Sequence, residues 1–173
     1  MQPLIIAVLC FMASPGVRQE PAWRQFASAE GKFSASMPSD PRISTRVTNT
    51  KGGSLLTHMV SSTDDNLNEF MVSWTEYESP TFEQKGTEAT FNKMRDALVA
   101  VNQGKVLSEA VINAGGHPAR AIKFSAADGR IITVRFYFIG NRVYQVMAQT
   151  KPENTESGER FFESFKLMPG TLV

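Results

Sequence analysis

The stretch GGHPARAIKFSAADGRIITVRFYFIGNRVYQVMAQTK, residues 115–151, decides the fold. It contains three runs in which apolar and polar residues alternate, a pattern typical of half-buried β-strands. The dipeptides Asp128-Gly129 and Gly140-Asn141 separate the runs. Both suit two-residue hairpin turns, because Gly and Asn tolerate the positive φ that such turns need. The stretch therefore predicts a three-stranded antiparallel meander.

Two-residue turns fix which residues face one another across the meander. The second turn pairs Tyr137 with Tyr144, and the first pairs Arg120 with Tyr137. One face then carries Ala119, Ala121, Val134, Phe136, Phe138, Val143 and Met147. The other face carries Ile122, Phe124, Tyr137, Tyr144, Val146 and Ala148, together with Arg120 and Arg135. Both faces are too apolar to meet water, so each must be covered. A longer first turn would shift the row of Arg120.

The rest of the chain supplies more strands and the covering helices. Alternating or extended runs predict strands at residues 31–38, 42–48, 55–61, 70–77 and 106–112, the last with the character of an edge strand. Apolar residues at helical spacing predict helices at residues 83–102 and 155–167. The sequence thus predicts an α+β fold: a central antiparallel β-sheet with a helix on both faces, which is a three-layer αβα sandwich.

Length and charge limit the class of protein. A chain of 173 residues can bury the core of one domain. Its 18 basic and 17 acidic residues give a formal net charge of +1, and no run of Lys or Arg concentrates positive charge locally. Nucleic-acid binding is therefore not expected, because it depends on a concentrated positive field.

The N-terminus is typical of an export signal. Residues 4–13 (LIIAVLCFMA) are apolar, and no charged side chain precedes Arg18. Such a run is too short to span a bilayer but fits the apolar region of a signal peptide, although a Lys or Arg before it is missing. Small residues favour cleavage after Gly16, and the alternative is a buried N-terminal strand or helix. The resulting organisation is a signal peptide at 1–16, a tether at 17–22, a single domain at 23–168 and a tail at 169–173.

The single cysteine, Cys10, lies inside this leader. Leu9 precedes it where a lipoprotein has a small residue, so lipid anchoring at Cys10 is not expected. Removal of the leader leaves a mature chain without cysteine, which excludes disulfides, thiol catalysis and cysteine-bound metals. No second apolar stretch follows, so we expect an exported protein, periplasmic or secreted, with no membrane span.

Catalytic and metal-binding patterns are weak. The two histidines, His58 and His117, have no donors at ligand spacing, and Asp64-Asp65 fits a turn. No Gly-x-Ser-x-Gly or phosphate-binding loop is present. Glu76 and Glu78 fit solvated charges better than a glycosidase pair. We therefore expect no catalytic residue, no metal and no cofactor.

One polar cluster is a candidate ligand site. The predicted register places Arg120, Arg135, Tyr137 and Tyr144 on one face, where paired guanidinium groups and phenols could hold a carboxylate or phosphate. The structural alternative is that the arginine stems lie over aromatic rings and pair with carboxylates of the covering helix.

With these elements in place, the chain resembles the PsbP-like superfamily over residues 22–167, and most closely its exported bacterial members of unknown function. The resemblance rests on Trp23-x-x-Phe26, on residues 30–38 (EGKFSASMP), 116–120 (GHPAR), 135–145 (RFYFIGNRVYQ) and 161–165 (FFESF). It implies an αβα sandwich that acts as a binding or assembly module without catalysis. Photosystem subunits of the family help retain ions, but this sequence shows neither a thylakoid leader nor their metal-binding histidines, so that role is not transferred.

Three hypotheses about function remain open. The first is a non-enzymatic binding or assembly module that contacts a protein partner, which an exposed apolar patch would favour. The second is a carrier of a small anionic ligand, which a cavity with converging polar groups would favour. The third is a hydrolase of unknown type, which would require a nucleophile in contact with a base.

Overall fold

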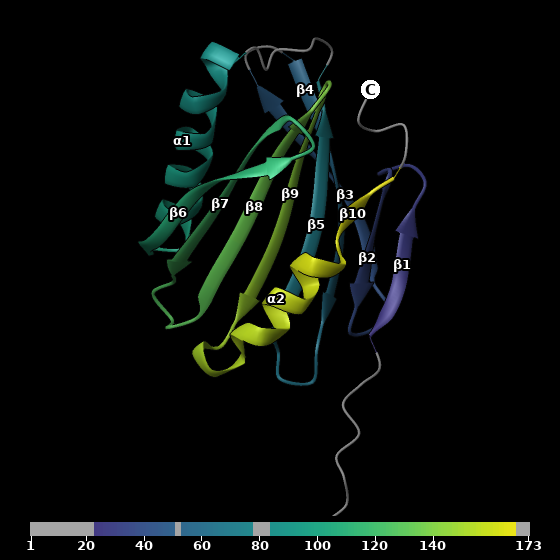
Figure 1. The fold of residues 1–173 in the computed structure, drawn as a ribbon, viewed down its shortest axis with the longest axis vertical. Coiled ribbons are helices and arrows are strands. Elements are labelled where there is room, and N and C mark those ends of the chain that lie inside the picture. Colours follow the sequence, from purple (N-terminus) through teal and green to yellow (C-terminus); the bar gives the residue numbers. More distant parts are fainter. Residues whose placement is uncertain (1–22, 51–52, 78–83, 169–173) are drawn as a thin grey trace, which may run out of the picture.

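The computed structural model describes residues 23–50, 53–77 and 84–168 (Figure 1). The predicted signal peptide, tether and C-terminal tail lie outside the described residues, as do Cys10, Glu78 and the proposed cleavage after Gly16. The described ranges cover most of the predicted domain.

A seven-stranded antiparallel sheet forms the centre of the molecule, with the strand order β3-β4-β5-β9-β8-β7-β6. Its strands are β3 (Arg42–Thr50), β4 (Gly53–Thr63), β5 (Glu69–Glu76), β6 (Lys105–Ala114), β7 (His117–Ser125), β8 (Ile131–Ile139) and β9 (Arg142–Thr150). The meander of β7, β8 and β9 is therefore confirmed. The edge position predicted for residues 106–112 is also confirmed, because β6 pairs with only one of the described strands, β7.

A second, three-stranded sheet has the order β1-β2-β10. It consists of β1 (Arg24–Ser28), β2 (Phe33–Met37) and the two-residue β10 (Lys166–Leu167). The sequence predicted β2 but neither β1 nor β10. Both unpredicted strands are short and pair with β2. Their own sequences are too short to show an alternating pattern, so they do not indicate this pairing.

Two α-helices are described, α1 (Gln84–Val101) and α2 (Thr155–Ser164), with a 3₁₀ turn η1 (Pro152–Asn154) before α2. The second helix ends three residues earlier than predicted. At its C-terminal end the Ser164 hydroxyl donates to the Phe161 carbonyl and accepts the backbone N–H of Ser36, which fixes α2 against β2. Neither helix is both long and apolar enough to cross a membrane.

The predicted register of the meander is correct for the β8–β9 hairpin and wrong for the β7–β8 hairpin. Across β8 and β9, Tyr137 faces Tyr144 as expected. Across β7 and β8 the prediction is wrong, because the turn is wider than two residues: Ser125 faces Ile131, and the Ala126 N–H donates to the Arg130 carbonyl at 2.8 Å. Asp128 stabilises this wider turn by accepting from the Arg130 N–H and side chain.

The wider turn moves the β7 side chains to the other face of the sheet. Arg120 faces Phe136 and not Tyr137, and Ile122 faces Val134. The β7 part of the predicted face assignment is therefore wrong, since a shift of one residue inverts every side chain of a strand.

Alternate residues of the meander enter two separate cores. The first core, which we call the α2 core, contains Phe33, Ala35, Met37, Val60, Phe70, Val72, Trp74, Ala119, Tyr137, Ile139, Tyr144, Val146, Ala148, Phe161 and Phe162. The second, the α1 core, contains Phe91, Ile122, Phe124, Ile132, Val134, Phe136, Phe138 and Val143. The α2 core joins α2 and the small sheet to the large sheet, and the α1 core joins α1 to the meander. The described chain is thus an α+β fold made mostly of antiparallel sheet, with two helices.

Candidate functional site

The structure separates the four residues of the predicted cluster. Arg135 and Tyr137 alternate on β8 and lie on the α2 side of the sheet, where Tyr144 faces Tyr137. Arg120 lies on the α1 side, opposite Phe136. The prediction that all four share one face is wrong for Arg120, and the wider Asp128-Gly129 turn is the reason.

Arg120 is enclosed in an ion-pair network. Its guanidinium pairs with Glu88 of α1 and donates to Glu109 of β6 at 2.8 Å and to Asn92 at 3.0 Å. Its Cζ lies 5.0 Å from the centre of the Phe91 ring. This is the arrangement that the structural alternative predicts, in which the stem covers a ring and the charge pairs with the helix.

Glu109 responds to this network electrostatically. Burial by itself would raise the pKa of Glu109, but hydrogen bonds from Arg95 and Arg120 outweigh burial, and the pKa lies below its usual value. The carboxylate therefore stays ionised between two guanidinium groups. Helix α1 and the edge strand β6 are joined through these charges.

On the α2 side the two tyrosines are parts of the core. Tyr137 is 8 % exposed and stacks on Phe165 with ring centres 5.5 Å apart. Tyr144 is fully buried, and its hydroxyl has no hydrogen-bond partner among the described residues. Burial raises the pKa of both phenols, an effect that Arg135 opposes at Tyr137 and Arg142 opposes at Tyr144. Both phenols therefore stay neutral parts of the packing.

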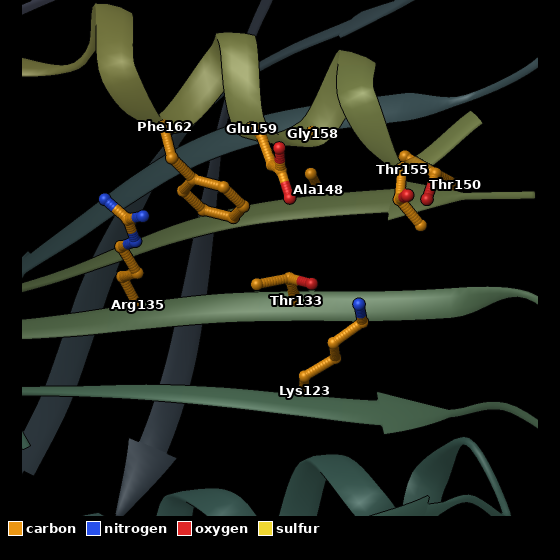
Figure 2. Close-up of a pocket in the computed structure, with 9 residues that line it drawn as sticks. All are labelled: Lys123, Thr133, Arg135, Ala148, Thr150, Thr155, Gly158, Glu159 and Phe162. Carbon is orange, nitrogen blue, oxygen red and sulfur yellow. The ribbon is translucent and has the colours of Figure 1, made fainter. Parts of the chain in front are cut away.

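A cleft of about 170 Å³ lies between α2 and strands β7, β8 and β9 (Figure 2). It is lined by Lys123, Thr133, Arg135, Ala148, Thr150, Thr155, Gly158, Glu159 and Phe162. Residues of the same face of the sheet form its floor, and α2 forms one wall. Of the predicted site residues, only Arg135 lines it, and neither Tyr137 nor Tyr144 does.

Charged groups face one another across this cleft. Lys123 points from β7 toward the helix, and Glu159 points from α2 toward the sheet (Figure 2). The Arg135 guanidinium lies over the Phe162 ring, with its Cζ 4.6 Å from the ring centre. Neither Lys123 nor Arg135 has a carboxylate ion-pair partner among the described residues. The cleft can therefore accept negative charge from a ligand.

Most of this lining could not be identified from the sequence. No local sequence pattern marks Lys123 or Thr133 as site residues, although they face each other directly across β7 and β8. The alternation of β8 does put Thr133 and Arg135 on one face. The missing information was the β7 register and the position of α2, which together bring Lys123 and Glu159 to the same cleft.

The other candidates have structural partners. His58 stacks on Trp74 with ring centres 4.8 Å apart, and its Nδ1 lies 3.2 Å from Glu30. Asp64 accepts from the backbone N–H groups of Asn66 and Asn68, which is the turn chemistry expected for Asp64-Asp65. Glu76 pairs with Arg142. Within the described ranges, no group of three or more His, Cys, Asp or Glu side chains is placed to hold a metal ion.

Comparison with known proteins addresses the fold. No protein-family model and no curated protein sequence matches the chain. A solved structure from Bacteroides thetaiotaomicron is similar at 14 % identity and a TM-score of 0.46, over 86 % of this chain and 49 % of that chain. The solution structure of cyanobacterial PsbP (CyanoP) from Synechocystis sp. PCC 6803 is similar at 11 % identity and a TM-score of 0.57, over 90 % of this chain and 98 % of that chain. The chain therefore has a PsbP-like fold, as its sequence landmarks predicted.

Proposed function

We propose that this protein is an exported, non-enzymatic binding module that holds a carboxylate or phosphate group in the cleft beside α2. The observation that carries the proposal is the pair of cations, Lys123 and Arg135, that line the cleft without a carboxylate ion pair among the described residues. By contrast, a carboxylate pairs with each of the other described arginines that are buried or half-buried, which are Arg95, Arg120, Arg130 and Arg142. A half-buried cation without an ion-pair partner loses hydration, and nothing fully compensates for that loss. The negative charge of a bound ligand would supply the compensation.

The other lining residues indicate the size and polarity of the ligand. Hydroxyl groups of Thr133, Thr150 and Thr155 offer hydrogen bonds, while Phe162 provides an apolar wall. A cleft of about 170 Å³ is smaller than the pockets of about 300–1,000 Å³ that enclose drug-sized ligands. The ligand is therefore a small acid or the acidic end of a larger molecule. Glu159 favours one that also carries a hydrogen-bond donor.

This proposal revises the predicted ligand carrier. Arg135 stays in the site, whereas Arg120 is neutralised on the other side of the sheet and the phenols of Tyr137 and Tyr144 belong to the core. Lys123 takes the place that was predicted for Arg120. In the proposed site, the acidic group of the ligand thus contacts the two cations, Lys123 and Arg135, and the hydroxyl groups of the lining threonines.

The test is an NMR titration of backbone amides with acetate and with inorganic phosphate at constant ionic strength. We expect saturable shifts at Thr133, Arg135, Thr150 and Thr155. The double variant Lys123→Gln/Arg135→Gln should lose them. The control Arg42→Gln/Arg46→Gln removes the same charge from the exposed strand β3 and should keep them. Shifts that are absent, or that the Lys123/Arg135 variant retains, would overturn the proposal.

Assembly with a protein partner is a second candidate, and exposed apolar side chains on β3 and β4 favour it. Ile43, Val47 and Leu56 are 64 %, 62 % and 43 % exposed. Val47 faces Leu56 across the two strands, so both lie on one face. An envelope protein captured by the wild type and lost by Val47→Glu/Leu56→Glu would support this candidate. Equal capture by both would remove it.

We include the three-layer αβα arrangement in the proposal. Its support comes from β8, along which Phe136 and Phe138 alternate with Tyr137 and Ile139. Phe91 of α1 packs with the first pair, and Phe161 and Phe162 of α2 pack with the second pair.

The hydrolase alternative lacks such support. His58 stacks on Trp74 and lies beside Glu30, so it is not positioned as a base for a nucleophile.

A further inference from the structure

Three methionines lie on one face of the large sheet, on the side opposite the cleft. Met71 of β5 directly faces Met147 of β9, and Met59 of β4 faces Ser73, two residues along β5 from Met71. Met147 packs against the α1 core, which identifies the face as the α1 side. All three methionine side chains are intermediate in burial, so they are neither sealed in the core nor free in solvent.

The register makes Met71 the direct neighbour of Met147 and the diagonal neighbour of Met59, so Met71 lies between the other two. Directly opposed residues have Cβ atoms about 5 Å apart, and diagonal neighbours are about 7–8 Å apart, within the span of long side chains. Met59, Ser73 and Gln145 form the neighbouring cross-strand row. Ser73 is the smallest of these side chains and is only 6 % exposed, so longer neighbouring side chains cover it.

One contact shows the direction of a sulfur atom. The Gln145 side-chain amide donates to the Met147 Sδ at 3.9 Å. Gln145 lies two residues before Met147 on β9 and faces Ser73, so the Met147 sulfur is turned along β9 toward the row that contains Gln145, Ser73 and Met59. The flexible thioether chain of methionine can adjust by rotation about three bonds, which lets Met71 and Met59 follow.

The chemistry of these donors selects the ligand. Thioether sulfur is soft and uncharged, and in proteins it binds Cu(I) and not the hard divalent ions that prefer oxygen. Apart from one another, the cross-strand partners of the three methionines among the described strands are Ser44, Ser61, Ser73 and Val134, and none of these is a carboxylate. We propose that Met59, Met71 and Met147 form a binding site for a soft monovalent metal ion, Cu(I), separate from the anion cleft. These thioether donors differ from the histidine and carboxylate ligands, for which the sequence shows no ligand spacing, and from cysteine.

The first test uses Ag(I), a diamagnetic mimic of Cu(I), with the full-length chain carrying Cys10→Ser so that no thiol competes. Methionine methyl groups are labelled with ¹³C and followed by NMR in chloride-free buffer. We expect the methyl signals of Met59, Met71 and Met147 to shift together and to saturate at one equivalent. Met37, which is buried in the α2 core, should not shift. No shift, or shifts of all methionines alike, would overturn the proposal.

The second test measures Cu(I) affinity by competition with a chromogenic chelator under reducing conditions. Met71→Leu and Met147→Leu should each weaken binding at least about ten-fold, because even the outer partners of a metal site contribute about 10–100-fold. Met37→Leu is the matched control and should bind as the parent does. Leucine keeps the volume of methionine, so all variants should fold. Unchanged affinity in both Met71→Leu and Met147→Leu would show that these methionines are packing residues only.

The proposals for the anion cleft and for the Cu(I) site can be tested separately. The variant Lys123→Gln/Arg135→Gln alters the α2 side of the sheet and should bind Cu(I) normally. Loss of Cu(I) binding in that variant would overturn the separate thioether site, whatever the outcome of the anion titration.

Discussion

The Arg120 Nη1 lies 2.8 Å from the Glu109 Oε1, and this contact ties the edge strand β6 to its neighbour β7. The same guanidinium pairs with Glu88, so one arginine side chain, only 7 % exposed, connects two strands to helix α1. Removal of a buried charge from such a network leaves its partners without compensation.

Arg120→Ala should therefore lower the free energy of unfolding by about 3 kcal/mol, at the low end of the range for broken buried ion pairs because Glu88 is largely exposed. Urea denaturation measures the change. The control Arg46→Ala, on the exposed strand β3, should stay within about 0.5 kcal/mol of wild type. Anion binding in the α2 cleft should be unaffected by Arg120→Ala. Weaker anion binding with unchanged stability would contradict the structural role of this residue.

The lowered pKa of Glu109 makes part of this stabilisation depend on pH. A carboxyl group with a lower pKa in the folded state than in the unfolded state stabilises the fold above its unfolded pKa, near 4.3, and loses that effect as pH falls toward its folded pKa. The stability difference between wild type and Glu109→Gln should thus shrink as pH falls below about 5. Urea titrations at pH 7, 5 and 3 check this. A difference that stays constant or grows toward pH 3 is the opposite result.

Tyr144 carries a buried hydroxyl without a hydrogen-bond partner among the described residues. Tyr144→Phe removes an unpaired polar group and keeps the ring, so stability should stay within about 1 kcal/mol of wild type or rise. Tyr144→Ala is the contrast, because loss of the fully buried ring should cost about 3–5 kcal/mol. Thermal and urea unfolding of both variants measure this. A large loss in Tyr144→Phe would mean that the hydroxyl has a partner.

Two glycines should respond oppositely to alanine. At Gly104, an added Cβ would lie 2.5 Å from the Ser125 carbonyl oxygen and 2.9 Å from the Phe124 ring, so Gly104→Ala should cost about 1–3 kcal/mol. At Gly158 in α2, the Cβ would lie 3.4 Å from the Ala148 Cβ, an ordinary contact. Gly158→Ala should therefore stabilise the helix by about 0.5–1 kcal/mol. Equal effects of the two changes on urea unfolding would contradict this packing.

Several elements of the fold could be predicted from local sequence. The β8–β9 hairpin followed from Gly140-Asn141, because Gly140 adopts a φ of 58° and the tight turn sets the register. Helix α1 followed from Phe91, Met94 and Leu98 at helical spacing. The β7–β8 register did not follow, since Asp128-Gly129 is compatible with turns of several lengths and the Asp128–Arg130 contacts select the wider one.

The candidate site was less predictable than the fold. Arg135 was identified from its strand, but Lys123, Thr155 and Glu159 come from elements whose relative position no local pattern encodes. The predicted face of Arg120 is wrong because a one-residue difference in a turn reverses the side chains of a whole strand. The three methionines look unrelated in the sequence, and only the pairing of β4, β5 and β9 makes them neighbours.

The sequence by itself determined the elements, because alternation, helical spacing and turn residues act over a few neighbouring positions. It also determined the residue types available for chemistry and the resemblance to PsbP-like proteins. Only the tertiary structure decided which side chains meet. The Asp128 turn sends Arg120 toward α1, α2 closes a cleft over Lys123 and Arg135, and three strands bring Met59, Met71 and Met147 together. Such contacts depend on register and on packing between distant segments, which local sequence preferences do not fix.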